Sequence, residues 1–501
     1  MSSRSYSNLL DLTSDHFPPP LPRQQHRLIP RVMTVPGILF DEQEDQEEDQ
    51  EEAGGDVSPA VTPLPTSLPQ ERCVIIAANV LPLNCERRRR KCKSLEKSGD
   101  EKWCFSWDYD SLLLQLKRGL SHGMGVFYIG FLKVEIEANE QEEVASYLLE
   151  AFHCVPVFVP PDVRHRFYHG FCKQQLWPLF HYMLPLTPAH GGLIYDRLLW
   201  QAYVSVNKNF AEKVMEVINP DDDYVWVHDY HLMLLPTFLR KKWSRVKLGF
   251  FLHSPFPSSE IYRTLPVRDE MLRALLNADV IGFHTFDYAR HFLSCCRRIL
   301  GVEYESKRGY ISLEYYGRTV NVKIMPVGIH MEQLQACLDL PETHRQIAEL
   351  QQRFKGKMVL LGVDDMDIFK GIGLKLLAME HLLSQHPEWV GKVVMVQIAN
   401  PARSHGKDVE EVQTEAHGIV DRINKVFGGG VEEDYKPVVL IERHVTLSER
   451  IAYYTVAECC VVTAVRDGMN LIPYEYIVCR QGRNVVAPDE INPDQRCSLT
   501  H

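Results

Sequence analysis

The strongest constraint on the fold is a repeated alternation of short apolar runs with longer segments of helical period. Strand-length runs form a first series at Cys73–Ala78, Met124–Gly130, Val155–Val159, Tyr224–His228, Lys247–His253, Val280–His284 and Val320–Met325, and a second at Met358–Val363, Val393–Ala399, Val438–Ile441, Cys459–Ala464 and Asn484–Ala487. Helical segments between them include Arg164–Met183, Leu193–Val217, His231–Trp243, Asp287–Leu300, Ile372–Ser384, Val409–Val426 and Ser448–Val456. Apolar strands that alternate with amphipathic helices predict parallel sheets covered by helices on both faces.

The two series predict an α/β protein with two Rossmann-type, doubly wound domains that face a cleft. We expect the domains to cover residues 71–328 and 329–501, joined near Pro326–Ile329. Residues 1–70 are rich in proline and acidic side chains, and we expect them to form a disordered tail because they cannot bury enough apolar area. The basic run Arg87–Lys93 follows the first strand, where we expect a solvated loop, with a nuclear address or an anion patch as the alternatives.

Composition excludes several classes of protein. Of a net charge of −11, ten negative charges lie between Asp41 and Asp56, so the rest of the chain is nearly neutral. A nucleic-acid binder needs a basic excess, which is absent. No run approaches the about 18 apolar residues that cross a bilayer, so we expect no membrane partner. No secretory signal is visible and the 13 cysteines have no regular spacing, which favours reduced thiols and a cytoplasmic location.

One motif stands out in the N-terminal tail. Arg31, Thr34 and Pro36 form the pattern R-x-x-T-x-P, a type that 14-3-3 proteins accept, once phosphorylated, through an arginine cluster. We therefore expect phosphorylation of Thr34 and a 14-3-3 partner there. The alternative is an unmodified stretch of tail.

Polar residues follow three of the predicted strands, at His228–His231, His253–Pro257 and Arg466–Asn470. Function in α/β enzymes lies at the carboxyl ends of strands, so these residues are expected to face one cleft. No glycine-rich phosphate loop follows the first strand, which argues against an NTPase or a dehydrogenase. Zinc and serine-hydrolase motifs are also absent from the sequence.

Five segments carry a resemblance to a known family: LWPLFHY (Leu176–Tyr182), VHDYHLMLLP (Val227–Pro236), FFLHSPFPSSEIYRTLP (Phe250–Pro266), IGFHTFDYARHF (Ile281–Phe292) and RDGMNLIPYEY (Arg466–Tyr476). In these, the chain resembles the trehalose-6-phosphate synthase family (glycosyltransferase family 20), which comprises retaining glucosyltransferases of the GT-B type. The resemblance runs from about Cys73 to Ala487. The tail and details of the core are similar to the second plant class of the family.

The resemblance implies transfer of glucose from UDP-glucose to glucose 6-phosphate, which yields trehalose 6-phosphate and UDP in trehalose biosynthesis, without a metal or other cofactor. The N-terminal domain would bind the acceptor and the C-terminal domain the nucleotide sugar. Matching positions imply an acceptor-phosphate site at Tyr168, Trp177 and Arg403, an acceptor-sugar carboxylate at Asp229, contacts to the transferred glucose at His253 and Asp467, a diphosphate lysine at Lys370, a ribose clamp at Glu475 and a further donor-binding residue at Asn470.

The sequence departs from the family pattern at three places. Asp365, in VDDMDIFKG (Val363–Gly371), and Val80 stand where active members carry arginines, and Ser106–Asp108 lies near the place of an absent Gly-Gly loop. A unit charge pair about 5 Å apart at an effective dielectric near 20 is worth roughly 3 kcal/mol. Exchanging attraction for repulsion at Asp365 would therefore cost roughly 6 kcal/mol before relaxation.

These departures leave two functions open. The first is the glucosyltransferase itself, and the alternative is a sugar-phosphate-sensing regulator of the same fold with weak or no catalysis. Relatives of the plant class continue beyond the segment that follows Ala487 here, so we also expect a truncated second domain.

Overall fold

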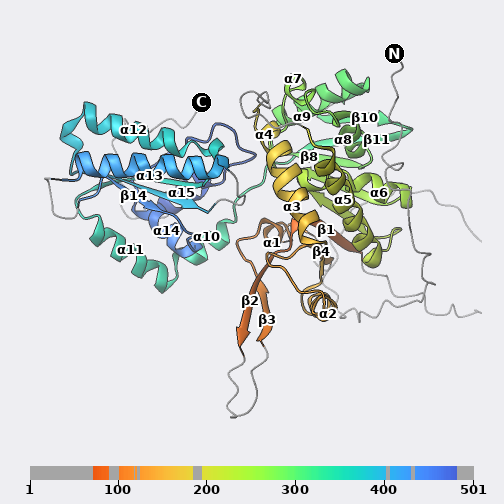
Figure 1. Cartoon of the computed structure of the whole chain (residues 1–501), viewed down its shortest axis with the longest axis horizontal. Helices are drawn as coiled ribbons and strands as arrows, with labels where there is room; N and C mark the ends of the chain where they lie inside the picture. The colour runs from red at the N-terminus through yellow and green to blue at the C-terminus, as the bar shows by residue number, and fades with distance from the viewer. Residues whose placement is uncertain are drawn as a thin grey trace, which may run out of the picture.

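The computed structural model describes residues 72–89, 101–117, 119–120, 124–183, 195–307, 309–401, 407–429 and 435–481. The predicted tail with Thr34, the acceptor-site candidate Arg403 and the predicted strand Asn484–Ala487 lie outside the described residues. The described elements form two lobes that lie side by side (Figure 1).

A nine-stranded sheet organises the first lobe. Its strands run in the order β5 (Cys154–Pro156), β4 (Gly125–Phe131), β1 (Cys73–Val80), β6 (Tyr224–His228), β7 (Lys247–Leu252), β8 (Val280–Phe283), β11 (Arg318–Ile324), β10 (Tyr310–Tyr315) and β9 (Tyr304–Lys307). All neighbouring strands from β5 to β11 are parallel, whereas β10 and β9 add an antiparallel edge. The sequence did not indicate this edge.

A four-stranded parallel sheet organises the second lobe, in the order β14 (Val438–Ile441), β13 (Val393–Asn400), β12 (Met358–Asp365) and β15 (Cys459–Cys460). The predicted strand Cys459–Ala464 is longer than the observed β15. Only Cys459 and Cys460 pair with β12, and the chain then leaves the sheet as a loop.

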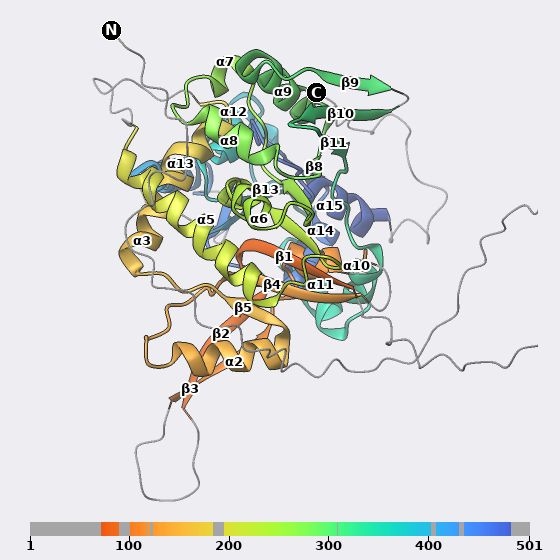
Figure 2. The ribbon, with the colours of Figure 1, turned by 90° about the vertical axis from the view of Figure 1, so that its right-hand side faces the viewer.

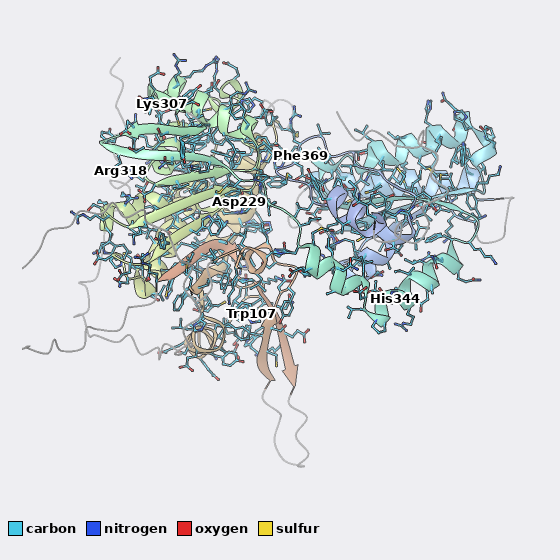
Figure 3. The ribbon with its side chains drawn as sticks, turned by 180° about the vertical axis from the view of Figure 1, so that it is seen from behind. Trp107, Asp229, Lys307, Arg318, His344 and Phe369 are labelled. Carbon is cyan, nitrogen blue, oxygen red and sulfur yellow. The ribbon has the colours of Figure 1, made fainter. Side chains whose placement is uncertain are left out.

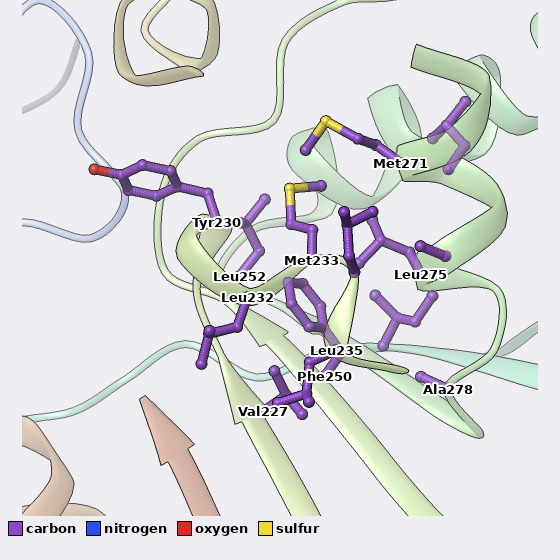
Figure 4. Close-up of a cluster of buried hydrophobic side chains, with 14 of the residues drawn as sticks. Val227, Tyr230, Leu232, Met233, Leu235, Phe250, Leu252, Met271, Leu275 and Ala278 are labelled. Carbon is purple, nitrogen blue, oxygen red and sulfur yellow. The ribbon is translucent and has the colours of Figure 1, made fainter. Parts of the chain in front are cut away.

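Both sheets are buried on two faces, as the continuous apolar strands predict. Along β1, Ile75 and Ala77 belong to one core and Val74 and Ile76 to the other, because successive side chains point to opposite faces. The second sheet divides in the same way between two smaller cores. Figure 4 shows part of the largest core, where side chains of β6, β7 and α8 lie together.

Helices cover the sheets on both sides (Figure 2). Those of the first lobe are α1 (Leu112–Lys117), α2 (Gln141–Phe152), α3 (Pro161–His165), η2 (Arg166–Leu176), α4 (Trp177–Phe180), α5 (Arg197–Val217), η4 (Tyr230–Leu232), α6 (Leu235–Lys242), α7 (Ser259–Tyr262), α8 (Arg268–Leu275), α9 (Phe286–Cys295) and η5 (Cys296–Leu300). Those of the second are α10 (Met331–Leu338), α11 (Pro341–Arg353), η6 (Ile368–Lys370), α12 (Ile372–Gln385), η7 (Pro387–Trp389), α13 (Lys407–Phe427), α14 (Leu447–Val456) and α15 (Ile472–Gln481).

The basic run after β1 corrects one prediction. Its first residues belong to β2 (Leu83–Arg89), which pairs with β3 (Glu101–Trp107) in a hairpin that extends away from the sheet (Figure 1). Arg87 lies over the ring of Trp103 and forms an ion pair with Glu140, 3.5 Å apart. This part of the run is therefore an ordered strand rather than a solvated loop.

Candidate active site

Asp229 directly follows β6 in an unusual backbone conformation, with φ 69° and ψ 172°. This region is sparsely populated by residues other than glycine and costs on the order of 1–3 kcal/mol. Its Oδ1 atom accepts hydrogen bonds from the backbone N–H of His253 and of Ser254, each at 3.2 Å, and from the Ser254 hydroxyl at 3.1 Å. The carboxylate thus fixes the end of β7 against the end of β6, close to the boundary between the lobes (Figure 3).

His253 belongs to a group of neutral histidines. Its Nε2 atom lies 2.9 Å from Nδ1 of His228, so one proton is shared in a hydrogen bond between the two rings. Burial lowers the pKa of His253 to about 4, and the pKa of His228 also lies well below its usual value. His284, at the end of β8, has a pKa of about 4 because of burial and of the adjacent His253. These rings therefore offer uncharged hydrogen-bonding groups at neutral pH.

Lys370 and Asp467 form the main ion pair of the second lobe at this boundary. The Lys370 Nζ atom lies 2.6 Å from Asp467 Oδ2, and both side chains are largely buried. Burial lowers the pKa of Lys370, but the carboxylates of Asp467, Asp365 and Asp364 outweigh it and the net pKa is raised. Lys370 therefore stays protonated, surrounded by more carboxylates than its single charge can neutralise.

Asp365, the residue that departs from the family pattern, lies at the end of β12 opposite Asn400. The Asn400 amide donates to its Oδ1 atom at 3.2 Å. The neighbouring Asp364 is neutralised by the buried Lys375, at 2.6 Å. Asp365 therefore adds negative charge near Lys370. Val80, the second departure, ends β1 next to a register shift.

Several contacts join the two lobes here. The Trp177 indole N–H donates to Asp367 Oδ2 at 3.1 Å, and the Tyr288 hydroxyl donates to the Asp467 carbonyl at 2.6 Å. His181 stacks on Phe369, with ring centroids 4.6 Å apart. The predicted acceptor-phosphate residue Trp177 is thus already bound to a carboxylate of the other lobe.

Tyr168 and Trp177 come from one continuous segment, η2 and the start of α4. The Lys173 ammonium lies 4.0 Å from the Trp177 ring centroid and 5.8 Å from that of Tyr168. A cation between two aromatic rings suits a phosphate group. The motif comparison did not identify Lys173, although its position between the two candidates was a usable signal.

A cavity of about 270 Å³ is lined by both lobes. The first lobe contributes His253, His284, Asp110, Leu112 and Gln115, and the second lobe with the connecting segment contributes Val327, Ile329, His330, Gln333, Leu334, Leu447, Arg450, Asp467, Met469, Leu471 and Glu475. Three predicted site residues therefore line one cavity, and Lys370 is joined to it through Asp467.

The remaining donor-side candidates hold the cavity wall. Glu475 Oε2 accepts a hydrogen bond from the Tyr454 hydroxyl at 2.9 Å and lies 3.3 Å from Nε of Arg450. Asn470 Oδ1 accepts the backbone N–H of Ile472, which fixes the start of α15. Motif comparison identified neither Arg450 nor Tyr454, because both lie on an ordinary amphipathic helix.

The described residues contain no group of three or more His, Cys, Asp or Glu side chains placed to hold a metal ion. The expectation of a metal-free reaction stays a prediction. Among the described helices, none combines the length and apolar character needed to cross a bilayer.

Solved structures resemble this arrangement of lobes. One is the N-terminal domain of the Candida albicans trehalose-6-phosphate phosphatase, with a TM-score of 0.69 and 29% identity over 83% of this chain and 81% of that one. Another, from E. coli and bound with UDP-2-fluoro glucose, has a TM-score of 0.66 and 24% identity over 81% of each chain. Each lobe is built on a mainly parallel sheet covered by helices, and the two lobes share a cavity. This architecture places the protein in the GT-B class.

The family follows from the sequence comparisons. Residues 75–487 match the model of glycosyltransferase family 20. The chain is 63% identical to alpha,alpha-trehalose-phosphate synthase [UDP-forming] 6 of Arabidopsis thaliana, over 96% of this chain and 54% of the relative. It is 40% identical to alpha,alpha-trehalose-phosphate synthase [UDP-forming] 1 of Aspergillus fumigatus, over 82% of this chain and 76% of the relative. The chain belongs to glycosyltransferase family 20 and is of the plant trehalose-phosphate synthase type, but spans about half the length of its Arabidopsis relative.

Proposed function

We propose that the protein is a UDP-forming glucosyltransferase that transfers glucose from UDP-glucose to glucose 6-phosphate and produces trehalose 6-phosphate. The observation that carries this proposal is the cavity lined jointly by His253, Asp467 and Glu475, with Lys370 bound to Asp467. The family membership and the neighbour bound with UDP-2-fluoro glucose support a nucleotide-sugar donor.

The proposed chemistry is mainly electrostatic. Lys370 would stabilise the negative charge that develops on the departing diphosphate. His253, held neutral by burial, would bind a sugar hydroxyl, and Asp229 would hold the His253 backbone in place. Tyr168, Trp177 and Lys173 would bind the acceptor phosphate once Trp177 releases Asp367.

The test is UDP release from UDP-glucose and glucose 6-phosphate by the wild type, Asp365→Asn and Asp365→Arg. Asn removes the repulsive charge and Arg adds an attractive one, so the rate should rise in that order. Solvent screening would reduce the roughly 6 kcal/mol difference between repulsion and attraction to about half. Asp365→Arg should therefore raise the rate of UDP release about 100-fold. No UDP release by the wild type, even where Asp365→Arg releases it, would contradict the proposal.

The comparisons do not favour the alternative of a catalytically inactive sensor. That function would require glucose 6-phosphate binding without any UDP release. The domain boundaries, phosphorylation of Thr34, a 14-3-3 partner and a cytoplasmic location stay predictions from the sequence.

A further inference from the structure

Arg450, on α14, is a largely buried cation in the cavity wall. Its side chain is 19% exposed, and its Nε atom lies 3.3 Å from Glu475 Oε2. Geometry suitable for a hydrogen bond is absent, and Nε is buried without a hydrogen-bond partner among the described residues. The guanidinium donates no hydrogen bond to the described part of the chain, although it carries five N–H groups.

A buried guanidinium without hydrogen-bond acceptors is unfavourable, so a ligand that supplies an acceptor would stabilise it. Arginine stays charged in proteins, so it cannot relieve its burial by losing a proton. Buried donors without partners are costly, and ligand sites commonly use such groups to fix orientation. Among the described residues that line the cavity, Arg450 is the only lysine or arginine.

The surroundings of Arg450 suit a flat ring with carbonyl groups. Leu112, Leu334, Leu447 and Leu471 supply apolar walls to the same cavity. Asp110, from the other lobe, also lines it and provides a carboxylate acceptor. Uracil presents two carbonyl acceptors on either side of one N–H donor, which a guanidinium and a carboxylate complement. Adenine presents one ring-nitrogen acceptor beside an amino donor on the same edge, so it offers a guanidinium one acceptor where uracil offers two.

We propose that Arg450 is the base-specificity residue of the donor site and donates to a uracil carbonyl. Glu475, whose carboxylate is oriented by Arg450 and Tyr454, would then face the ribose. This inference rests on the proposed function, because it assumes a nucleoside diphosphate sugar in the cavity.

The experiment measures UDP and ADP binding by calorimetry for the wild type and Arg450→Met. Loss of a hydrogen bond from a charged donor should weaken UDP binding about 10- to 100-fold, with a smaller loss for ADP, which offers fewer acceptors on one edge. Arg345→Met is the matched control, since Arg345 is an exposed arginine of the same lobe and should change neither affinity. Equal losses for UDP and ADP, or an unchanged UDP affinity, would overturn the assignment.

Two additions keep the outcomes separate. If Arg450→Met does not fold, Arg450→Lys keeps a cation beside Glu475 but removes the planar donors, and the same loss of UDP selectivity is expected. If the wild type binds neither nucleotide, the proposed function fails and the inference fails with it. If the wild type binds UDP while both variants keep its affinity and selectivity, only the assignment of Arg450 is wrong.

Discussion

At the scale of single residues, buried histidines dominate the boundary between the lobes. Besides His253, the rings of His181, His228 and His284 are each at most 5% exposed. Burial lowers the pKa of His181 and of His284 to about 4. Val327 N–H donates to Nδ1 of His284, which fixes that nitrogen as an acceptor. Neutral rings at this boundary tie the stability of the protein to pH.

The pH dependence has a definite sign. Unfolded histidine has a pKa near 6.5, so between about pH 6.5 and 4 the unfolded chain binds more protons than the folded one. The free energy of unfolding should therefore fall as pH falls through this window, by about 1.4 kcal/mol per pH unit for each such histidine. His284→Asn keeps an acceptor for Val327 and should reduce the slope by one such contribution.

Urea unfolding between pH 7 and 5 measures this slope. His344 is exposed on α11 of the second lobe, so His344→Gln is the control and should leave the slope unchanged. An identical slope for the wild type and His284→Asn would show that His284 is not held neutral.

At the scale of elements, the loop Arg466–Asn470 after β15 brings the second lobe against the first. A Cβ atom on Gly468 would lie 1.8 Å from the carbonyl oxygen of His253, far closer than two non-bonded atoms can approach. Only glycine permits this approach of two backbones. The loop also carries Asp467, so its position sets both the ion pair with Lys370 and the cavity wall.

Gly468→Ala should therefore separate the loop from β7 without unfolding either lobe. We expect UDP binding to weaken at least about tenfold, which is about 1.4 kcal/mol, while the helical circular dichroism signal is kept. Gly418→Ala is the matched control, because Gly418 lies exposed on α13 with no atom near its Cβ position. That variant should keep UDP affinity and gain about 0.5–1 kcal/mol of stability. Unchanged UDP affinity in Gly468→Ala would contradict the close approach.

At the scale of the whole molecule, sequence alone predicts local pattern better than long-range pairing. The bounds of β6 match the prediction, because an apolar run there stops at the polar Asp229. The β2–β3 hairpin escaped notice, since β2 ends in three consecutive arginines and the apolar run of β3, Trp103–Phe105, is short. The contact of Trp177 with Asp367 joins residues 190 positions apart, and no local pattern encodes it. The motif resemblance identified His253, Asp467 and Glu475, which line one cavity. It did not identify Tyr454, which binds Glu475.

The Trp177–Asp367 contact predicts competition between lobe closure and acceptor binding. Asp367 accepts the indole N–H with Oδ2 and the Phe369 backbone N–H with Oδ1. In Asp367→Asn the amide nitrogen can only donate, so one of these bonds is lost together with the negative charge. With the amide oxygen on the Phe369 N–H the indole is released, and removal of a repulsion of about 1 kcal/mol, the value for unit charges 4 Å apart in water, should tighten glucose 6-phosphate binding about fivefold.

Small-angle scattering and calorimetry together test this competition. The radius of gyration without ligand should rise in Asp367→Asn, because the lobes lose a direct contact. Tyr288→Phe is the control, since it removes another hydrogen bond between the described parts of the two lobes but leaves the charge near Trp177 unchanged. It should also raise the radius of gyration, yet give no gain in glucose 6-phosphate affinity. A gain of equal size in both variants would mean that opening the lobes, rather than release of the indole, controls acceptor binding.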